Sequence, residues 1–195
     1  MCNLLCMLVL IVAYQGSVLA FPSGSPSSAC TSMAPRHNDG SGGLYSAQPH
    51  ASSVYTIITD KANYSVNQEV RVWIADSRTG ADRGYKGIML QARVPNGTAP
   101  QGIWMNPPTN TKMIMCSSAN DTISHSNTMV KNESNVFIWK PDGISADVQF
   151  VLTVAQRKSI FWVQQKSGLV KFNSASTLAS SVLTLVLSFS FALLL

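Results

Sequence analysis

The histidines His37, His50 and His125 are the side chains of this 195-residue chain best suited to metal binding or proton transfer. Either role would require them to converge with carboxylates. His50 lies in a Pro- and Ser-rich stretch, which favours simple exposure. We expect hydrogen-bonded structural roles for His37 and His125, with no metal site and no cofactor.

Hydrolytic catalysis would require a nucleophile, a base and an orienting group. Serine is abundant, but no serine lies in a G-x-S-x-G motif. Met113, Met115 and nearby Met105 could be ligands for a soft metal. Alternating apolar residues that lead into a cysteine are more simply explained by strand packing. The sequence therefore predicts a protein that is not an enzyme.

Basic and aromatic residues suggest a binding surface. Arg78 and Arg83 lie in a short polar turn, and Lys86 follows closely. Loops on a rigid β-scaffold commonly carry recognition, so this turn could contact an anionic glycan; the alternative is a solvated turn. Trp73 alternates out of phase with apolar neighbours and could face solvent, whereas Trp104, Trp139 and Trp162 are expected in the core around a disulfide.

The net charge of +5 favours anionic partners such as glycans or microbial surfaces. The basic residues are scattered, without the basic runs and interleaved aromatics of nucleic-acid-binding proteins, so no nucleic-acid partner is expected.

Both ends of the chain resemble processing signals. Residues 1–20 are apolar and end in small residues, which predicts a signal peptide cleaved before Phe21. Residues 174–195 form an apolar tail without a following cation, which predicts glycolipid (GPI) attachment at Asn173 or Ser174; a transmembrane tail is the alternative. The predicted location is the cell surface through a lipid anchor, with secretion or a single membrane span as alternatives. The domain spans residues 21–173.

Only Cys30 and Cys116 remain after removal of the signal peptide. Two cysteines in an oxidising compartment allow one bridge, whereas a metal site would need further ligands that neither neighbourhood supplies. We expect the bridge to join two facing sheets. The sequence also contains four N-glycosylation acceptor motifs, at Asn63, Asn96, Asn120 and Asn132, each of which would have to be exposed.

The domain alternates β-like runs with turns. Period-two patterns at 70–74, 88–94 and 148–154, a β-rich run at 54–59, and shorter runs at 136–139 and 160–163 predict strands with one buried face. Residues 21–49 are rich in Ser, Gly and Pro and are expected to be irregular. Many short strands separated by turns predict an all-β antiparallel sandwich.

The order of motifs resembles the reeler domain, the amino-terminal module of reelin, and especially the small insect defence proteins built from it. The resemblance runs over residues 21–172. It rests on Cys30 and the Met-Ala-Pro-Arg-His run at 33–37, the segment Gly-Tyr-Lys-Gly-Ile-Met-Leu-Gln-Ala-Arg at 84–93, the Gly-Ile-Trp run at 102–104, Cys116, His125, and the aromatic segments at 136–141 and 161–162.

This resemblance implies a single immunoglobulin-like β-sandwich with a Cys30–Cys116 bridge. It also implies an extracellular, non-enzymatic binding role in innate defence, including antimicrobial defence; the alternative is a cell-adhesion or matrix module with a protein partner. His37 and His125 would lie near opposite cysteines, so the bridge could bring them close. Some relatives join the module to a ferric reductase, but the haem-binding membrane helices have no counterpart here.

Overall fold

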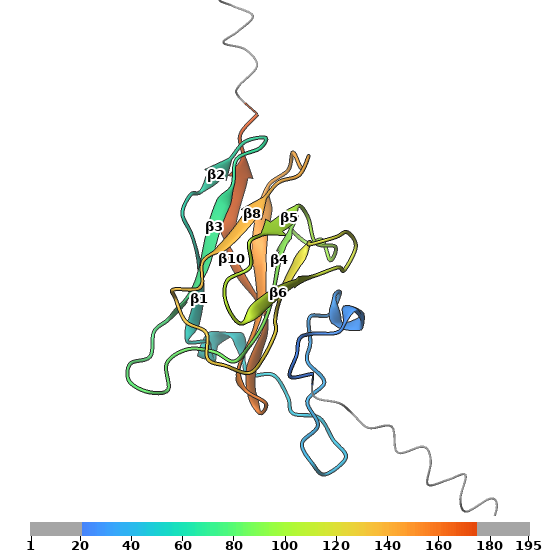
Figure 1. Cartoon of the computed structure of the whole chain (residues 1–195), viewed down its shortest axis with the longest axis vertical. Helices are drawn as coiled ribbons and strands as arrows, with labels where there is room; N and C mark the ends of the chain where they lie inside the picture. Colours follow the sequence, from blue (N-terminus) through green and yellow to red (C-terminus); the bar gives the residue numbers. More distant parts are fainter. Residues whose placement is uncertain (1–20, 175–195) are drawn as a thin grey trace, which may run out of the picture.

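A computed structural model describes residues 21–174 as two facing β-sheets preceded by an irregular segment (Figure 1). The predicted signal peptide (1–20) and almost all of the predicted tail lie outside the described residues. The elements are η1 (Ser27–Ala29), η2 (His50–Ser52), β1 (Tyr55–Thr59), β2 (Asn63–Tyr64), β3 (Val70–Asp76), β4 (Gly87–Arg93), β5 (Ile103–Met105), β6 (Thr111–Ile114), β7 (Thr122–His125), β8 (Phe137–Lys140), β9 (Val148–Arg157) and β10 (Ile160–Phe172).

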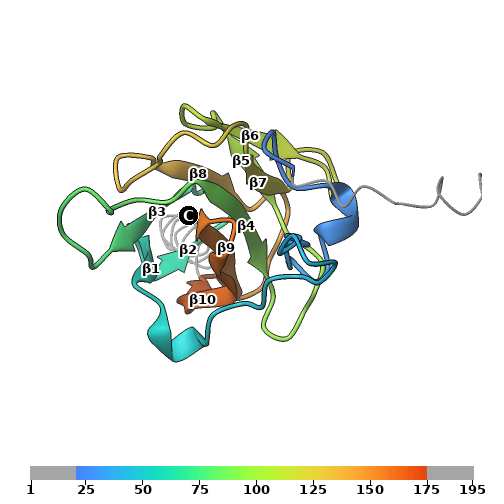
Figure 2. The same cartoon turned by 90° about the horizontal axis from the view of Figure 1, so that it is seen from below.

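The smaller sheet has the strand order β1-β3-β8-β5, and the larger has the order β2-β10-β9-β4-β7-β6. Figure 2, which looks along the sandwich, shows the two sheets facing each other across the core. All pairs are antiparallel except β2 with β10, which is a two-residue parallel pair. The predicted all-β sandwich is therefore confirmed.

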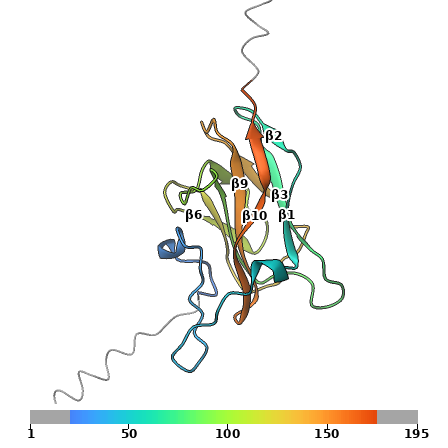
Figure 3. The same ribbon diagram turned by 180° about the vertical axis from the view of Figure 1, so that it is seen from behind.

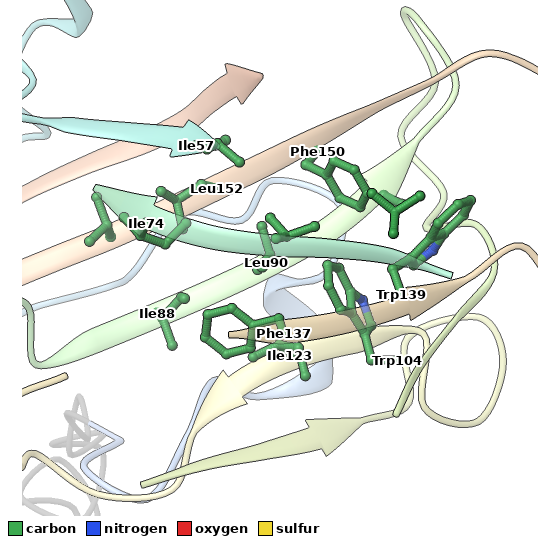
Figure 4. Packing of buried hydrophobic residues seen from close by; sticks show 14 of the residues in the cluster. Ile57, Ile74, Ile88, Leu90, Trp104, Ile123, Phe137, Trp139, Phe150 and Leu152 are labelled. Carbon is green, nitrogen blue, oxygen red and sulfur yellow. The ribbon is translucent and has the colours of Figure 1, made fainter. Parts of the chain in front are cut away.

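Period-two alternation builds the core. On β4, Ile88 and Leu90 point into the sandwich, and on β9 so do Phe150 and Leu152. Figure 4 shows these side chains packed with residues of the facing sheet, including Trp104 and Trp139. Trp104, Trp139 and Trp162 are at most 5% exposed, so their predicted core positions are confirmed.

Part of the outer face of the larger sheet, around Met89 of β4 and Val151 of β9, is also covered, by residues 21–49, which we call the lead-in (Figures 2 and 3). Met33 of the lead-in packs against Met89 and Val151, beside the Cys30–Cys116 bridge. The prediction that β4 has only one buried face was therefore wrong, because the lead-in shields Met89 and its outward neighbours from water.

The disulfide is confirmed, with a Cα–Cα distance of 5.6 Å. Its expected place is corrected: it ties the lead-in to the chain just after β6 on the outer face, and it does not join the two sheets. The three core tryptophans accordingly belong to the inter-sheet cluster and do not surround the bridge.

Strand lengths also differ from expectation. β10 extends to Phe172, well beyond the expected end near residue 163, because register shifts accommodate its polar stretch. The short strands β5 and β7 had no clear alternation in the sequence; β5 forms one edge of the smaller sheet, and β7 lies between β4 and β6 in the larger sheet.

Candidate functional site

The loop between β3 and β4, residues 77–86, is anchored by the carboxylate of Asp76 at the end of β3. Asp76 is 5% exposed, and its carboxylate accepts the backbone N–H of Gly84 at 2.7 Å and that of Arg78 at 3.0 Å. The Arg78 side chain adds two bonds, from Nε at 2.9 Å and from Nη2 at 2.6 Å. Two-point pairing of this kind fixes a guanidinium in orientation as well as in place.

Arg78 is therefore a structural residue of the loop. Its Nη2 also donates to the Tyr55 hydroxyl at 2.6 Å and to the Gly84 carbonyl at 2.8 Å. Burial opposes ionisation of Asp76, yet the bonds from Arg78 and Gly84 hold the pKa of this carboxyl below its usual value. The Arg78 donors are directed inward, to Asp76, Tyr55 and Gly84, so this side chain holds the loop in place and other residues of the loop face solvent.

The other predicted contact residues are placed differently. Arg83 is exposed and pairs with Glu133, whose carboxylate also accepts the backbone N–H of Asp76. Lys86 is exposed and forms no ion pair with any described residue. Trp73 lies on the outer face of the smaller sheet, half-buried opposite Ile58 on β1, and is not part of the loop.

The strand register adds further cations to this end of the sandwich. Gly87 and Phe161 both pair with Ala155, so the start of β4 lies beside the β9–β10 turn. Arg157 and Lys158 of that turn are exposed. We define the basic end as Arg36, Arg83, Lys86, Arg157 and Lys158.

Three of these five residues, Arg36, Arg157 and Lys158, were not among the contact residues predicted from the sequence. Arg36 joins them because its neighbour His37 contacts the Lys158 carbonyl at 2.7 Å. The signal for Arg157 and Lys158 was present, since they separate two predicted strands at the tip of a hairpin. The signal for Arg36 was not, because only folding brings the lead-in to this end.

The buried side chain of Lys131 holds the backbone of the basic end in place. Lys131 is 1% exposed, and its ammonium donates to the carbonyls of Lys86, Asn127 and Met129 at 2.8 to 3.0 Å. Burial lowers the pKa of Lys131 to about 8. The ammonium therefore fixes the backbone at Lys86 and the exposed turn at Met129.

His37 and His125 each bond a backbone carbonyl, as expected of structural histidines. Nε2 of His125 lies 3.0 Å from the Phe21 carbonyl, and burial lowers the pKa of both rings. His37 and His125 share no hydrogen bond, and His50 is exposed. In the described part of the chain, no three His, Cys, Asp or Glu side chains are grouped to hold a metal ion.

Two polar side chains on the outer face hold the lead-in. Arg93 donates through Nη2 to the carbonyls of Cys30 and Thr31, at 2.8 and 3.2 Å, and through Nε to Gln91 at 2.7 Å. Gln91 in turn donates to Thr122 at 3.1 Å. The Gln-Ala-Arg segment is thus the point where the larger sheet, the lead-in and the bridge meet.

The four predicted glycosylation asparagines, Asn63, Asn96, Asn120 and Asn132, are all exposed. Asn173 and Ser174 are exposed directly after β10, where the backbone N–H of Asn173 donates to Tyr64. Within residues 21–174, no helix has the length and apolar character needed to cross a bilayer.

The prediction that the methionines near Cys116 pack from a strand holds for Met113 and not for Met115. Met113 packs against the main core from β6, whereas Met115 is 66% exposed beyond the strand end.

The chain is similar in sequence to proteins of a known family. The Reeler domain family model matches residues 28–178. Putative defense protein 3 of Antheraea mylitta is 30% identical over 157 residues, which cover 80% of this chain and 89% of that protein. Putative ferric-chelate reductase 1 of Danio rerio is 28% identical over 177 residues, which cover 90% of this chain but only 29% of the reductase.

A solved structure agrees in fold. The crystal structure of the human F-spondin reeler domain superposes with a TM-score of 0.52 at 14% identity, covering 66% of this chain and 94% of that domain. Reeler-domain proteins are typically extracellular, and the match to the reductase reaches less than a third of that enzyme. The two sheets, the Cys30–Cys116 bridge and the family match over most of the chain show that this protein belongs to the reeler domain family.

Proposed function

We propose that this protein is a non-enzymatic extracellular binding protein in innate defence, with an antimicrobial role, and that it recognises anionic microbial or glycan surfaces through its basic end. The observation that carries the proposal is the gathering of cations from three separate segments at one end of a rigid sandwich. The relatives named as defence proteins support the choice of process.

The build of the basic end suits recognition of an anionic surface. Arg78 and Lys131 fix the backbone around Lys86 by internal bonds, which lowers the entropic cost of binding through the exposed cations. Lys86, Arg157 and Lys158 make no ion pair with a described carboxylate, so their charges are available to a ligand. Exposed charges of this kind act strongly at low ionic strength and are screened by salt.

The chain direction supports attachment at the opposite end. β10 begins at the basic end and finishes at Phe172 beside β2 (Figures 1 and 3). A lipid anchor on Asn173 or Ser174 would therefore direct the basic end away from the membrane. We propose such a GPI-anchored glycoprotein, with secretion or a membrane span as alternatives.

Binding of variants to immobilised lipopolysaccharide tests the recognition proposal. We expect Lys86→Gln/Lys158→Gln to elute at lower salt than the unmodified protein, whereas Lys140→Gln/Lys171→Gln, which removes the same charge elsewhere, elutes nearly unchanged. Equal losses in the two variants would show dependence on net charge alone. Retention that does not respond to salt would contradict the proposal directly.

A second candidate function is adhesion through a protein partner. The observation that favours it is the outer face of the smaller sheet, where Trp73 and Ile58 form a half-buried cross-strand pair with further apolar neighbours on β5 and β8. Aromatic residues of this kind often anchor protein interfaces. Loss of a host-protein complex on Trp73→Ala, with lipopolysaccharide retention unchanged, would favour adhesion.

A further inference from the structure

A small pocket lies on the outer face of the larger sheet, far from the basic end. The register pairs Arg93 with Gln149 at the end of β4 that is opposite Gly87, so the two surfaces occupy opposite ends of the sandwich. The pocket has a volume of about 140 Å³. Its polar lining consists chiefly of Arg93, Asn96, Thr98, Gln149, Gln164 and Lys166.

Arg93 is a buried arginine that forms no ion pair within the described part of the chain. The residue is 3% exposed, and its hydrogen bonds use Nη2 and Nε with neutral oxygens of the lead-in and of Gln91. Nη1 forms no hydrogen bond with a described residue and is accessible to solvent. No described carboxylate forms an ion pair with Arg93 or with Lys166, and none lines the pocket. A paired anion stabilises a buried cation, so an anionic group in the pocket would supply the ion pair that Arg93 does not make within residues 21–174.

A second observation comes from the backbone of β10. Gln164 has a φ of 54°, within a register shift between Trp162 and Gln165. Its N–H donates to the Thr153 hydroxyl at 3.2 Å, and its side chain donates to the Ser32 carbonyl at 2.8 Å. Bulges commonly re-aim a side chain near functional sites, and positive φ in a residue other than glycine persists only where neighbours impose it. Here the bulge turns Gln164 into the pocket wall.

We propose that this pocket binds the oxyanion of an acidic sugar unit, with Arg93 and Lys166 as the two cationic contacts. The guanidinium and ammonium donors suit a carboxylate or a sulfate group. The amides of Gln149 and Gln164 and the hydroxyl of Thr98 provide partners for ring hydroxyls. Because the volume is well below that of a drug-sized site, the ligand is one sugar residue or the end of a chain.

The pocket mouth includes a predicted glycosylation motif. Asn96 and Thr98 both line the pocket, so a glycan on Asn96 would stand at its entrance. The test is therefore made on the full-length protein from insect cells and in parallel on its Asn96→Gln variant. Binding in either background supports the site, and binding in neither overturns it.

Titration with glucuronate, N-acetylglucosamine 6-sulfate and glucose, followed by calorimetry or by NMR shifts, gives the decisive comparison. We expect at least one acidic sugar to bind about ten-fold more tightly than glucose. The two acidic probes distinguish a carboxylate from a sulfate ligand. Equal affinity for the acidic sugars and for glucose would overturn the proposal.

The site is assigned by a matched pair of variants on β10. Lys166→Gln should weaken binding of the acidic sugar by about five-fold, while Lys171→Gln, which removes an exposed charge away from the pocket, should leave it unchanged. Equal effects would overturn the assignment. Lys86→Gln/Lys158→Gln should retain sugar binding, so failure here is distinguishable from failure of the proposed function.

Discussion

Removal of the Cys30–Cys116 bridge should destabilise the domain without dismantling its sandwich. The bridge closes a loop of 86 residues, and the chain-entropy relation gives about 4.6 kcal/mol for a loop of this length. For a domain of about 150 residues, a loss of this size corresponds to a fall in Tm of about 9 to 18 °C.

The position of the bridge determines what should survive. Trp104 and Trp139 lie in the inter-sheet cluster, whereas the bridge packs with Met33 on the outer face. Cys30→Ser/Cys116→Ser should therefore keep the tertiary environment of the tryptophans, seen by near-ultraviolet circular dichroism. The lead-in should become sensitive to limited proteolysis, because its remaining ties are a few bonds such as those from Arg93.

Thermal and urea unfolding of the variant, beside the reduced and the oxidised natural protein, measure the effect. A Tm change below about 3 °C would refute the loop-closure reasoning. Loss of the tryptophan signal at low temperature would refute the placement of the bridge outside the main core.

Three further predictions concern the core and its buried charges. The folded pKa of Asp76 lies below its usual value of 3.8. The contribution of Asp76 to the free energy of unfolding is therefore present above pH 3.8 and is lost as the pH falls through the lower folded pKa. In acid titrations, the stability of Asp76→Asn should fall less steeply with decreasing pH than that of the natural protein. The pKa of Lys131 is lowered from 10.5 to about 8, so the unfolded chain binds more protons than the folded chain between these pH values. The free energy of unfolding should therefore rise with pH by up to about 3 kcal/mol over this range. Urea unfolding at each pH should show this rise for the natural protein and not for Lys131→Met. Trp104→Ala should cost about 3 to 5 kcal/mol in urea unfolding, whereas Trp73→Ala should cost less than about 2 kcal/mol because Trp73 is only half-buried.

The main strands could be predicted because their burial is periodic. Val70, Val72 and Ile74 on β3, and Ile88 and Leu90 on β4, alternate with outward residues as the pleat requires. The length of β10 could not be predicted in this way. Its register shifts interrupt the period, and its pairing partners β9 and β2 are set by the sheet.

Candidate contacts were harder to predict than strands. The sequence does not distinguish Arg78 from Lys86 as a cationic contact residue. The fold directs the Arg78 guanidinium inward to Asp76 and leaves Lys86 exposed. Arg93 follows the period-two pattern of an outward residue and is nevertheless buried, because the lead-in lies over it.

The sequence by itself determined the all-β sandwich, the one pairing available to the two cysteines of residues 21–173 and the membership of a family, since period-two burial, an even cysteine count and ordered motifs are local or countable properties. Only the tertiary structure decided where the bridge lies, which cations meet at the basic end and that the buried Arg93 forms no ion pair with a carboxylate of residues 21–174. These properties depend on contacts between segments far apart in the chain, and a segment without periodicity, such as the lead-in, carries no local signal of the surface it covers.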